Sequence, residues 1–134
     1  MHHPIQVVCA IIIEKGQVLC AQRAENMPLP LKWEFPGGKI ESGESAEDCL
    51  IREIKEELNL DISVSQRLKS NFHSYTEEKQ IELIPFLANI EYGNLQLKEH
   101  KEVRWVPISG LDSLDWAAAD VPIVRQISKD FKRE

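Results

Sequence analysis

The stretches GKIESGE (38–44) and REIKEELNL (52–60) place four acidic residues, Glu44, Glu53, Glu56 and Glu57, around one predicted helix. The last three fall on a single face of that helix, within roughly 100° of one another. Like charges three or four residues apart on a helix repel each other. A chain that concentrates carboxylates in this way is expected to hold a hard cation, and carboxylate oxygens suit Mg²⁺ or Mn²⁺.

The residues between and after these stretches predict where the helix begins and ends. Ser45 is a favourable N-cap, with the acidic Asp48 three places on, close to a capping box. Asn59 occupies the position after the helix, where a left-handed conformation is reached most easily by Gly and next by Asn. One apolar stripe at helical spacing predicts packing against a sheet; its members are Ala46, Cys49, Leu50, Ile54 and Leu58.

The spacing of these residues matches a known signature, the Nudix box. It runs Gly, five residues, Glu, seven residues, Arg-Glu, an aliphatic residue, any residue, Glu-Glu, any residue, Gly and an aliphatic residue. The chain departs only at Asn59, where the family has Gly, and agrees at Gly38, Glu44, Arg52, Glu53, Ile54, Glu56, Glu57 and Leu60. It therefore resembles the Nudix hydrolases, and within them the MutT-like and CTP pyrophosphohydrolase-like enzymes. The box occupies residues 38–60 of one expected domain, 1–134.

Length and composition are ordinary for one soluble domain: 134 residues, 43% hydrophobic and 28% charged. No apolar run reaches membrane-spanning length, and the N-terminus lacks the layout of a signal peptide. Cys9, Cys20 and Cys49 lie in apolar segments without metal-ligand spacing, so we expect reduced core thiols in the cytoplasm. The net charge of −6 argues against binding to a nucleic-acid polymer.

The remaining pattern predicts strands around two helices. The apolar run 5–13 is expected to be a buried central strand, with a turn at Lys15-Gly16 and a partner strand over 17–23. Residues 33–35 are expected to be extended, 62–75 and 81–90 to form a hairpin, and 102–106 another strand. A second helix is expected over 119–131. This order predicts a mixed sheet between helices, and the resemblance implies the same α/β/α sandwich.

The resemblance implies that Glu53, Glu56 and Glu57 coordinate a divalent metal, Mg²⁺ or Mn²⁺. A backbone carbonyl of Gly37 or Gly38 is an expected further ligand by the same analogy. A metal held there would bind phosphate oxygens, activate a water and neutralise developing charge. Either Glu53 or Glu56 is a candidate for the base that deprotonates the water, and the choice stays open.

Arg52 and Glu44 are expected to act mainly by orienting other groups. Arg52 leaves the helix at another angle from the three glutamates, so we expect it to fix carboxylates by ion pairing. Glu44 is expected to pair with Arg52, the alternative being the metal shell. A fourth metal carboxylate from outside the helix is common in the family. Glu102 is the preferred candidate here, and Glu99 the second choice.

Substrate contacts are predicted from other segments. Arg23 and Lys39 are candidates for binding phosphate, with solvated surface residues as the alternative. The segment 116–122 resembles the one that family members place beside the nucleobase. Asp120 there is expected to accept from an exocyclic amine such as N4 of cytosine, and is also well placed to cap the last helix. Phe35 and Phe72 are candidates for flanking the base, with core packing as the alternative.

These features lead to one preferred function. We expect a Mg²⁺-dependent hydrolase that converts a nucleoside triphosphate to a monophosphate and pyrophosphate, with a tilt toward CTP from Asp120. The first alternative is a MutT-type 8-oxo-dGTP diphosphatase. The others are a hydrolase of a nucleoside diphosphate linked to another group and a non-catalytic nucleotide sensor. A small-molecule nucleotide is the expected partner, and no membrane, nucleic-acid polymer or protein partner is expected.

Overall fold

A computed structural model describes residues 3–131, and its centre is the apolar strand β1 (Ile5–Glu14). Along its length β1 pairs in parallel with β7 (Gln80–Tyr92), from Ile5 opposite Ile81 to Ile12 opposite Ala88. Its other edge is shared: β4 (Gly37–Lys39) pairs antiparallel with the first half of β1, and β2 (Gln17–Gln22) with its end. The predicted central strand and its β2 partner are therefore confirmed.

The remaining strands extend this mixed sheet in two directions. Beyond β7 lie β5 (Asp61–Arg67) and β6 (Asn71–Ser74), both antiparallel to it. Two further strands pair antiparallel with β2: β3 (Trp33–Glu34) with its end at Ala21 and Gln22, and β8 (Glu102–Pro107) along its whole length. Short 3₁₀ turns follow β8 at Ile108–Ser113 and precede the last helix at Ala118–Asp120.

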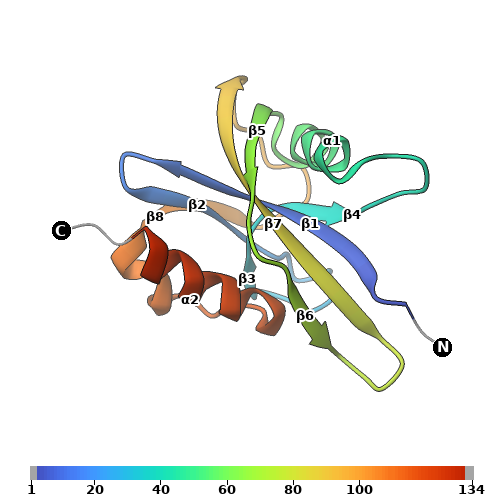
Figure 1. Cartoon of the computed structure of the whole chain (residues 1–134). Helices are drawn as coiled ribbons and strands as arrows, with labels where there is room; N and C mark the ends of the chain where they lie inside the picture. Colours follow the sequence, from blue (N-terminus) through green and yellow to red (C-terminus); the bar gives the residue numbers. More distant parts are fainter. Residues whose placement is uncertain (1–2, 132–134) are drawn as a thin grey trace.

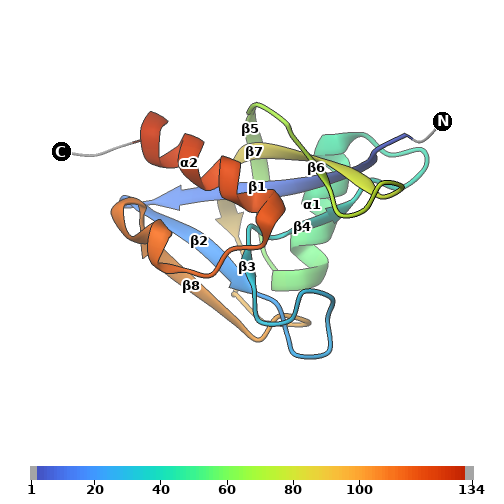
Figure 2. The ribbon, with the colours of Figure 1, turned by 90° about the horizontal axis from the view of Figure 1, so that it is seen from below.

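The two helices, α1 (Ala46–Leu58) and α2 (Val121–Asp130), lie on different sides of the sheet (Figures 1 and 2). Residues of β1 alternate between the two cores that result. Val8, Ala10 and Ile12 join the apolar stripe of α1, and Cys9 and Ile11 join the core under α2. Because both faces of β1 are covered over most of its length, its sequence is apolar without interruption from Val7 to Ile13. The α/β/α sandwich with a mixed sheet is confirmed.

Helix α1 has the ends that the sequence predicts. The Ser45 hydroxyl accepts a hydrogen bond from the backbone N–H of Asp48 at 3.0 Å, so Ser45 is the N-cap. Asn59 has φ 61° and ψ 32°, a left-handed conformation, and its N–H donates to the carbonyl of Lys55 at 3.1 Å. The exchange of the family's Gly for Asn at this position therefore keeps the backbone geometry that ends the helix.

Two expected elements have different bounds in the structure. The run 62–75 is not one strand, because residues 68–70 leave the sheet and β5 shifts register between Val64 and Gln66. The last helix begins at Val121 rather than 119. Asp120 stands at its N-cap position but its side chain makes no capping bond, so the expected capping role is wrong. The described residues contain no helix long and apolar enough to cross a membrane.

The end of α1 can be tested by stability. Asn59→Ala should lower the free energy of unfolding by about 1–2 kcal/mol, because Ala lacks the short polar side chain that lets Asn tolerate the left-handed conformation, and because the bond from Nδ2 to the carbonyl of Asn94 is lost. Asn59→Gly should stay within about 1 kcal/mol of the parent, since Gly adopts the left-handed conformation without strain and loses only that bond. Urea unfolding measures both, with Asn94→Ala as control, and equal stability of the Ala and Gly variants would contradict this assignment.

Candidate active site

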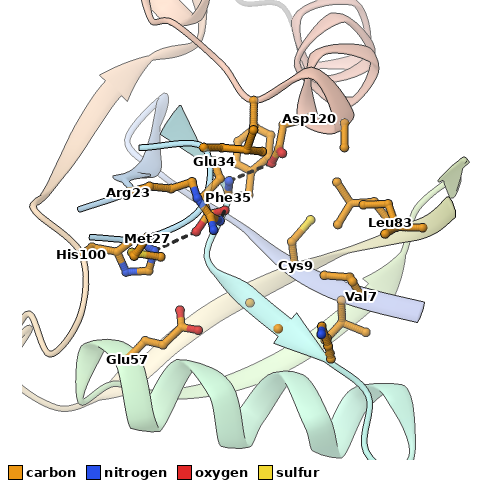
Figure 3. Close-up of a pocket in the computed structure, with 18 of the residues that line it drawn as sticks. Val7, Cys9, Arg23, Met27, Glu34, Phe35, Glu57, Leu83, His100 and Asp120 are labelled. Atoms are coloured by element: carbon orange, nitrogen blue, oxygen red, sulfur yellow. Dashed lines mark hydrogen bonds and ion pairs between the residues drawn. The ribbon is translucent and has the colours of Figure 1, made fainter. Parts of the chain in front are cut away.

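A cavity of about 250 Å³ lies between the start of β1, strand β4, the C-terminal half of α1 and the beginning of α2 (Figure 3). The residues that line it come from segments that are far apart in the chain. The polar residues that line it are Arg23, Glu34, Lys39, Glu57, Tyr75, Glu99, His100 and Asp120. Its apolar wall includes Val7, Phe35, Ile81 and Leu83. The predicted site residues can be placed against this cavity one by one.

Gly37 and Gly38 form the cavity edge where β4 approaches both β1 and α1. A Cβ on Gly37 would lie 1.9 Å from the carbonyl oxygen of Val8. A Cβ on Gly38 would lie 2.3 Å from the carboxyl carbon of Glu53. Gly37 has no room for a side chain because the Val8 backbone is in the way, and a side chain on Gly38 would displace the Glu53 carboxylate. The two glycines therefore let β4 approach both neighbours closely. The pair is more than a turn, because its backbone is part of the cavity.

Arg52 forms hydrogen bonds with three carboxylates of the Nudix box. Its guanidinium donates to Glu44 at 2.7 and 3.1 Å, and to Glu53 and Glu56 at 3.2 Å each. The expected pairing of Arg52 with Glu44 is thus observed. Arg52 lowers the pKa of Glu44 to about 2, with a smaller effect from the Glu41 backbone, and the carboxylates in turn raise the pKa of Arg52. Glu53 therefore has a fixed neighbour on each side, Arg52 and Gly38.

Glu57 is the most unusual acid of the group. It is 6% exposed, and Figure 3 shows its side chain rising from α1 into the cavity. Its Oε1 has no hydrogen-bond partner among the described residues. Burial, then the neighbouring Glu53, Glu34 and Glu99, raise its pKa well above the ordinary value. A buried acid without a partner is costly unless a cation or a proton neutralises it, so the donor chemistry here fits a divalent ion.

The other expected metal ligands are not all at the cavity. Glu56 is mostly exposed and turns to Arg52. Glu102 does not line the cavity. It is on β8, opposite Gln22 of β2, and it pairs with Arg104 at 2.9 Å. Glu99, the second candidate for the outer metal ligand, does line the cavity; it lies just before β8, the strand that carries Glu102. Within residues 3–131 no three Asp, Glu, His or Cys side chains already converge as a metal cage.

The far end of the cavity is built around Asp120. Its Oδ2 accepts a hydrogen bond from the backbone N–H of Phe35 at 3.0 Å, across the space between β3 and α2. Burial and the nearby Glu34 raise the pKa of Asp120 to about 8, although the bond from Phe35 and the charge of Arg23 oppose the shift. The Phe35 ring packs on Trp116, with centroids 4.7 Å apart, so Phe35 is both core and cavity wall.

Phe72 does not reach the cavity. On β6 it lies opposite Glu82, whereas its neighbours Asn71 and His73 lie opposite Leu83 and Ile81. Since strand residues alternate between faces, Phe72 points away from the face that lines the cavity, and it is 56% exposed. Tyr75 is the aromatic of this segment that lines the site. The strand register, which the sequence does not give, decides between the two.

The predicted phosphate contacts both line the cavity but differ in their surroundings. Lys39 is exposed at the end of β4. Arg23 is held in place, since its Nη1 lies 2.6 Å from Glu34 Oε1 and its Nε donates to the carbonyl of Pro28. Glu34 also accepts a bond from His100, at 2.8 Å. The sequence gives no signal for the pair of Glu34 and His100, because 66 residues separate them.

Comparison with known proteins agrees with the box and the fold. The family model for the NUDIX domain matches residues 1–127. A CTP pyrophosphohydrolase of Escherichia coli is 33% identical over 90% of this chain and 88% of its own. An 8-oxo-dGTP diphosphatase of Haemophilus influenzae is 32% identical over 92% of this chain and 90% of its own. A solved Staphylococcus aureus structure titled as the DNA mismatch repair protein MutT is 42% identical, with a TM-score of 0.77 and 97% and 99% of the two chains covered.

The chain belongs to the NUDIX domain family. Its interpretation as a Nudix hydrolase is confirmed by the family model and by relatives named as hydrolases. Nudix hydrolases generally use divalent metal ions and act on small nucleotide substrates. The residues around Glu57 fit that requirement, because they offer carboxylate oxygens and backbone at a cavity wall.

The raised pKa of Asp120 predicts how stability depends on pH. The folded carboxyl titrates at about 8 and the unfolded one near 3.8, so the folded state keeps an extra proton between these values. The contribution of Asp120 to stability therefore falls as pH rises from about 4 to about 8, and is level above that. Asp120→Asn removes this fall, since the amide oxygen still accepts from Phe35.

Thermal unfolding without added metal measures the effect. From about pH 5 to about pH 9, the parent should lose at least about 3 °C more in Tm than Asp120→Asn. Asp112→Asn, a change at an exposed carboxyl, is the control and should follow the parent. Parallel Tm curves for the parent and Asp120→Asn would contradict the assigned shift.

Proposed function

We propose that this chain is a Mg²⁺-dependent nucleoside triphosphate pyrophosphohydrolase that converts a triphosphate and water to a monophosphate and pyrophosphate. The observation that carries the proposal is the buried Glu57 carboxylate, whose Oε1 has no hydrogen-bond partner among the described residues and which lines a cavity edged by Gly37 and Gly38. The Nudix box supplies the reaction class, and the relatives named CTP pyrophosphohydrolase and 8-oxo-dGTP diphosphatase support a triphosphate substrate.

In this proposal Glu53, Glu56, Glu57 and Glu99, with a carbonyl of Gly37 or Gly38, hold the metal. The bound ion would neutralise phosphate charge and make water a better nucleophile. The chain contributes positioning. Gly38 fixes one side of Glu53, Arg52 holds the other side, and Glu53 or Glu56 takes the proton of the attacking water. Glu56 has to turn from Arg52 to join them. Arg23 and Lys39, which both line the cavity, are the proposed phosphate contacts.

We propose that the end of the cavity near Asp120 binds the purine or pyrimidine base through few polar contacts. Asp120 uses Oδ2 for the N–H of Phe35, and no described residue donates to its Oδ1. In the ionised form of the carboxyl, that oxygen is our proposed acceptor for an exocyclic amine such as N4 of cytosine. Phe35 and Tyr75 offer flanking rings, and Ile81 and Leu83 complete an apolar wall. A few contacts of this kind decide specificity by how strongly they bind the transition state.

The second candidate is 8-oxo-dGTP diphosphatase activity. It is favoured by the 32% identity to the Haemophilus influenzae enzyme, which nearly equals the 33% identity to the CTP pyrophosphohydrolase. We place the enzyme in the cytoplasm, with a small nucleotide rather than a polymer as its partner. Support comes from Cys9, Cys20 and Cys49, which are all unpaired and buried, and from the net charge of −6.

A substrate panel tests this function. We would measure kcat/KM with Mg²⁺ for CTP, dCTP, 5-methyl-dCTP, 8-oxo-dGTP and the common triphosphates, and identify the products. We expect monophosphate plus pyrophosphate, with a preference for cytosine that Asp120→Ala reduces by about tenfold or more, the scale of one lost polar contact. Preference for 8-oxo-dGTP would favour the second candidate. No turnover of any triphosphate would contradict the proposal.

A matched pair of variants tests which outer glutamate serves the metal. Glu99→Gln should weaken Mn²⁺ binding by about tenfold or more, because Glu99 lines the cavity beside Glu57. Glu102→Gln should bind Mn²⁺ like the parent, because Glu102 pairs with Arg104 outside it. The fraction of free Mn²⁺, read by electron paramagnetic resonance, gives both affinities. The reverse order would mean that Glu102 is the ligand.

A further inference from the structure

The segment that carries Glu99 is fastened to the rest of the site at three points. The backbone N–H of Lys98 donates to the carbonyl of Glu57 at 3.2 Å. On the other side, the N–H of Lys101 donates to the carbonyl of Gln22 at 2.9 Å. Between them, His100 Nε2 lies 2.8 Å from Glu34 Oε2, and Figure 3 shows this contact at the cavity wall. Of the three, only the His100 contact is made by a side chain.

Glu34 is a junction between two parts of the site. One carboxylate oxygen meets Arg23 at 2.6 Å, and the other meets His100 at 2.8 Å. Arg23 comes from the end of β2 and His100 from the segment before β8. Because Glu34 directly precedes Phe35 on the chain, its position is set by the strand that also forms the base end of the cavity. The contact therefore ties the Glu99 segment to a rigid part of the sheet.

Packing alone does not explain a histidine at position 100. The side chain is 1% exposed, and its Nδ1 has no hydrogen-bond partner among the described residues. With Nε2–H donating to Glu34, Nδ1 is a buried acceptor left unpaired, which costs free energy. An apolar side chain would fill the same space without that cost. The histidine is accounted for by the one bond that it makes, to Glu34.

We infer that His100 is a positioning residue, which through its bond to Glu34 holds the neighbouring Glu99 in place for binding a divalent cation. The inference rests on the proposed metal-dependent function and assigns part of that function to a residue outside the Nudix box. His100 acts through Glu99, so the two residues contribute to metal affinity as one unit. Residues that orient metal ligands in this way typically change metal affinity by about 10–100-fold when they are replaced.

Two substitutions of similar polarity isolate the bond. The side-chain nitrogen of Gln can stand where Nε2 stands, so His100→Gln should keep the donor to Glu34. Asn is one carbon shorter and cannot reach Glu34 in the same way, so His100→Asn should lose it. His3→Asn, a change at an exposed histidine, is the control. The probe is Mn²⁺ alone, with its affinity measured by electron paramagnetic resonance on the full chain, and Tm reports folding.

We expect His100→Asn to weaken Mn²⁺ binding by about 10–100-fold, and His100→Gln and His3→Asn to stay within about threefold of the parent. The double variant Glu99→Gln/His100→Asn should bind no more weakly than Glu99→Gln, because the two changes remove one interaction. Parent-like affinity in a folded His100→Asn, additive losses in the double variant, or a folded His100→Gln that binds as weakly as Glu99→Gln would each overturn the inference.

If His100→Asn does not fold, a folded His100→Gln that binds Mn²⁺ as weakly as Glu99→Gln still overturns the inference. Glu57→Gln separates this result from a failure of the proposed function. If the parent binds Mn²⁺ and Glu57→Gln weakens this binding, the proposed metal site is supported, and the His100 variants then test only the role of His100. If Glu57→Gln binds as the parent does, the proposed metal site itself is wrong, and the inference falls with it.

Discussion

The close approach of β4 to both β1 and α1 is the constraint on which the site depends. Gly37 lies against the carbonyl of Val8 at a distance that excludes a side chain, and Gly38 lies against the carboxylate of Glu53, which any side chain there would displace. This contact joins the parallel centre of the sheet to the acidic face of the helix. It also sets the course of the chain just before it, so that Glu34 and Phe35 reach the opposite wall of the same cavity.

The second organising feature is the distribution of charge. Arg52 gathers Glu44, Glu53 and Glu56 at the partly exposed end of the group, where the ion pairs satisfy the carboxylates. Deeper in the cavity Glu57 and Asp120 are buried, and the pKa of each is raised by burial first and by neighbouring acids next. Such perturbed acids in a cavity are typical of functional sites, since a fold gains no stability from them.

The local features of this chain could be predicted from sequence, and the long-range ones could not. The N-cap at Ser45, the left-handed end at Asn59 and the buried strand β1 follow from residue type and spacing. The placing of Phe72 away from the cavity depends on the register of β6 against β7. The placing of Glu99 rather than Glu102 at the cavity likewise depends on where β8 starts, which the sequence does not give. The pair of Glu34 and His100 joins segments that only the fold brings together.

We propose that the carboxylates beside Gly37 and Gly38 make a metal-dependent hydrolytic site. The most direct test is the release of pyrophosphate from a nucleoside triphosphate with Mg²⁺, by the parent and by Glu53→Gln. We expect the parent to turn over only with divalent metal, and Glu53→Gln to lose at least about 100-fold of this rate while its Tm stays near that of the parent. A folded Glu53→Gln that hydrolyses the nucleotide at the parent rate would contradict it.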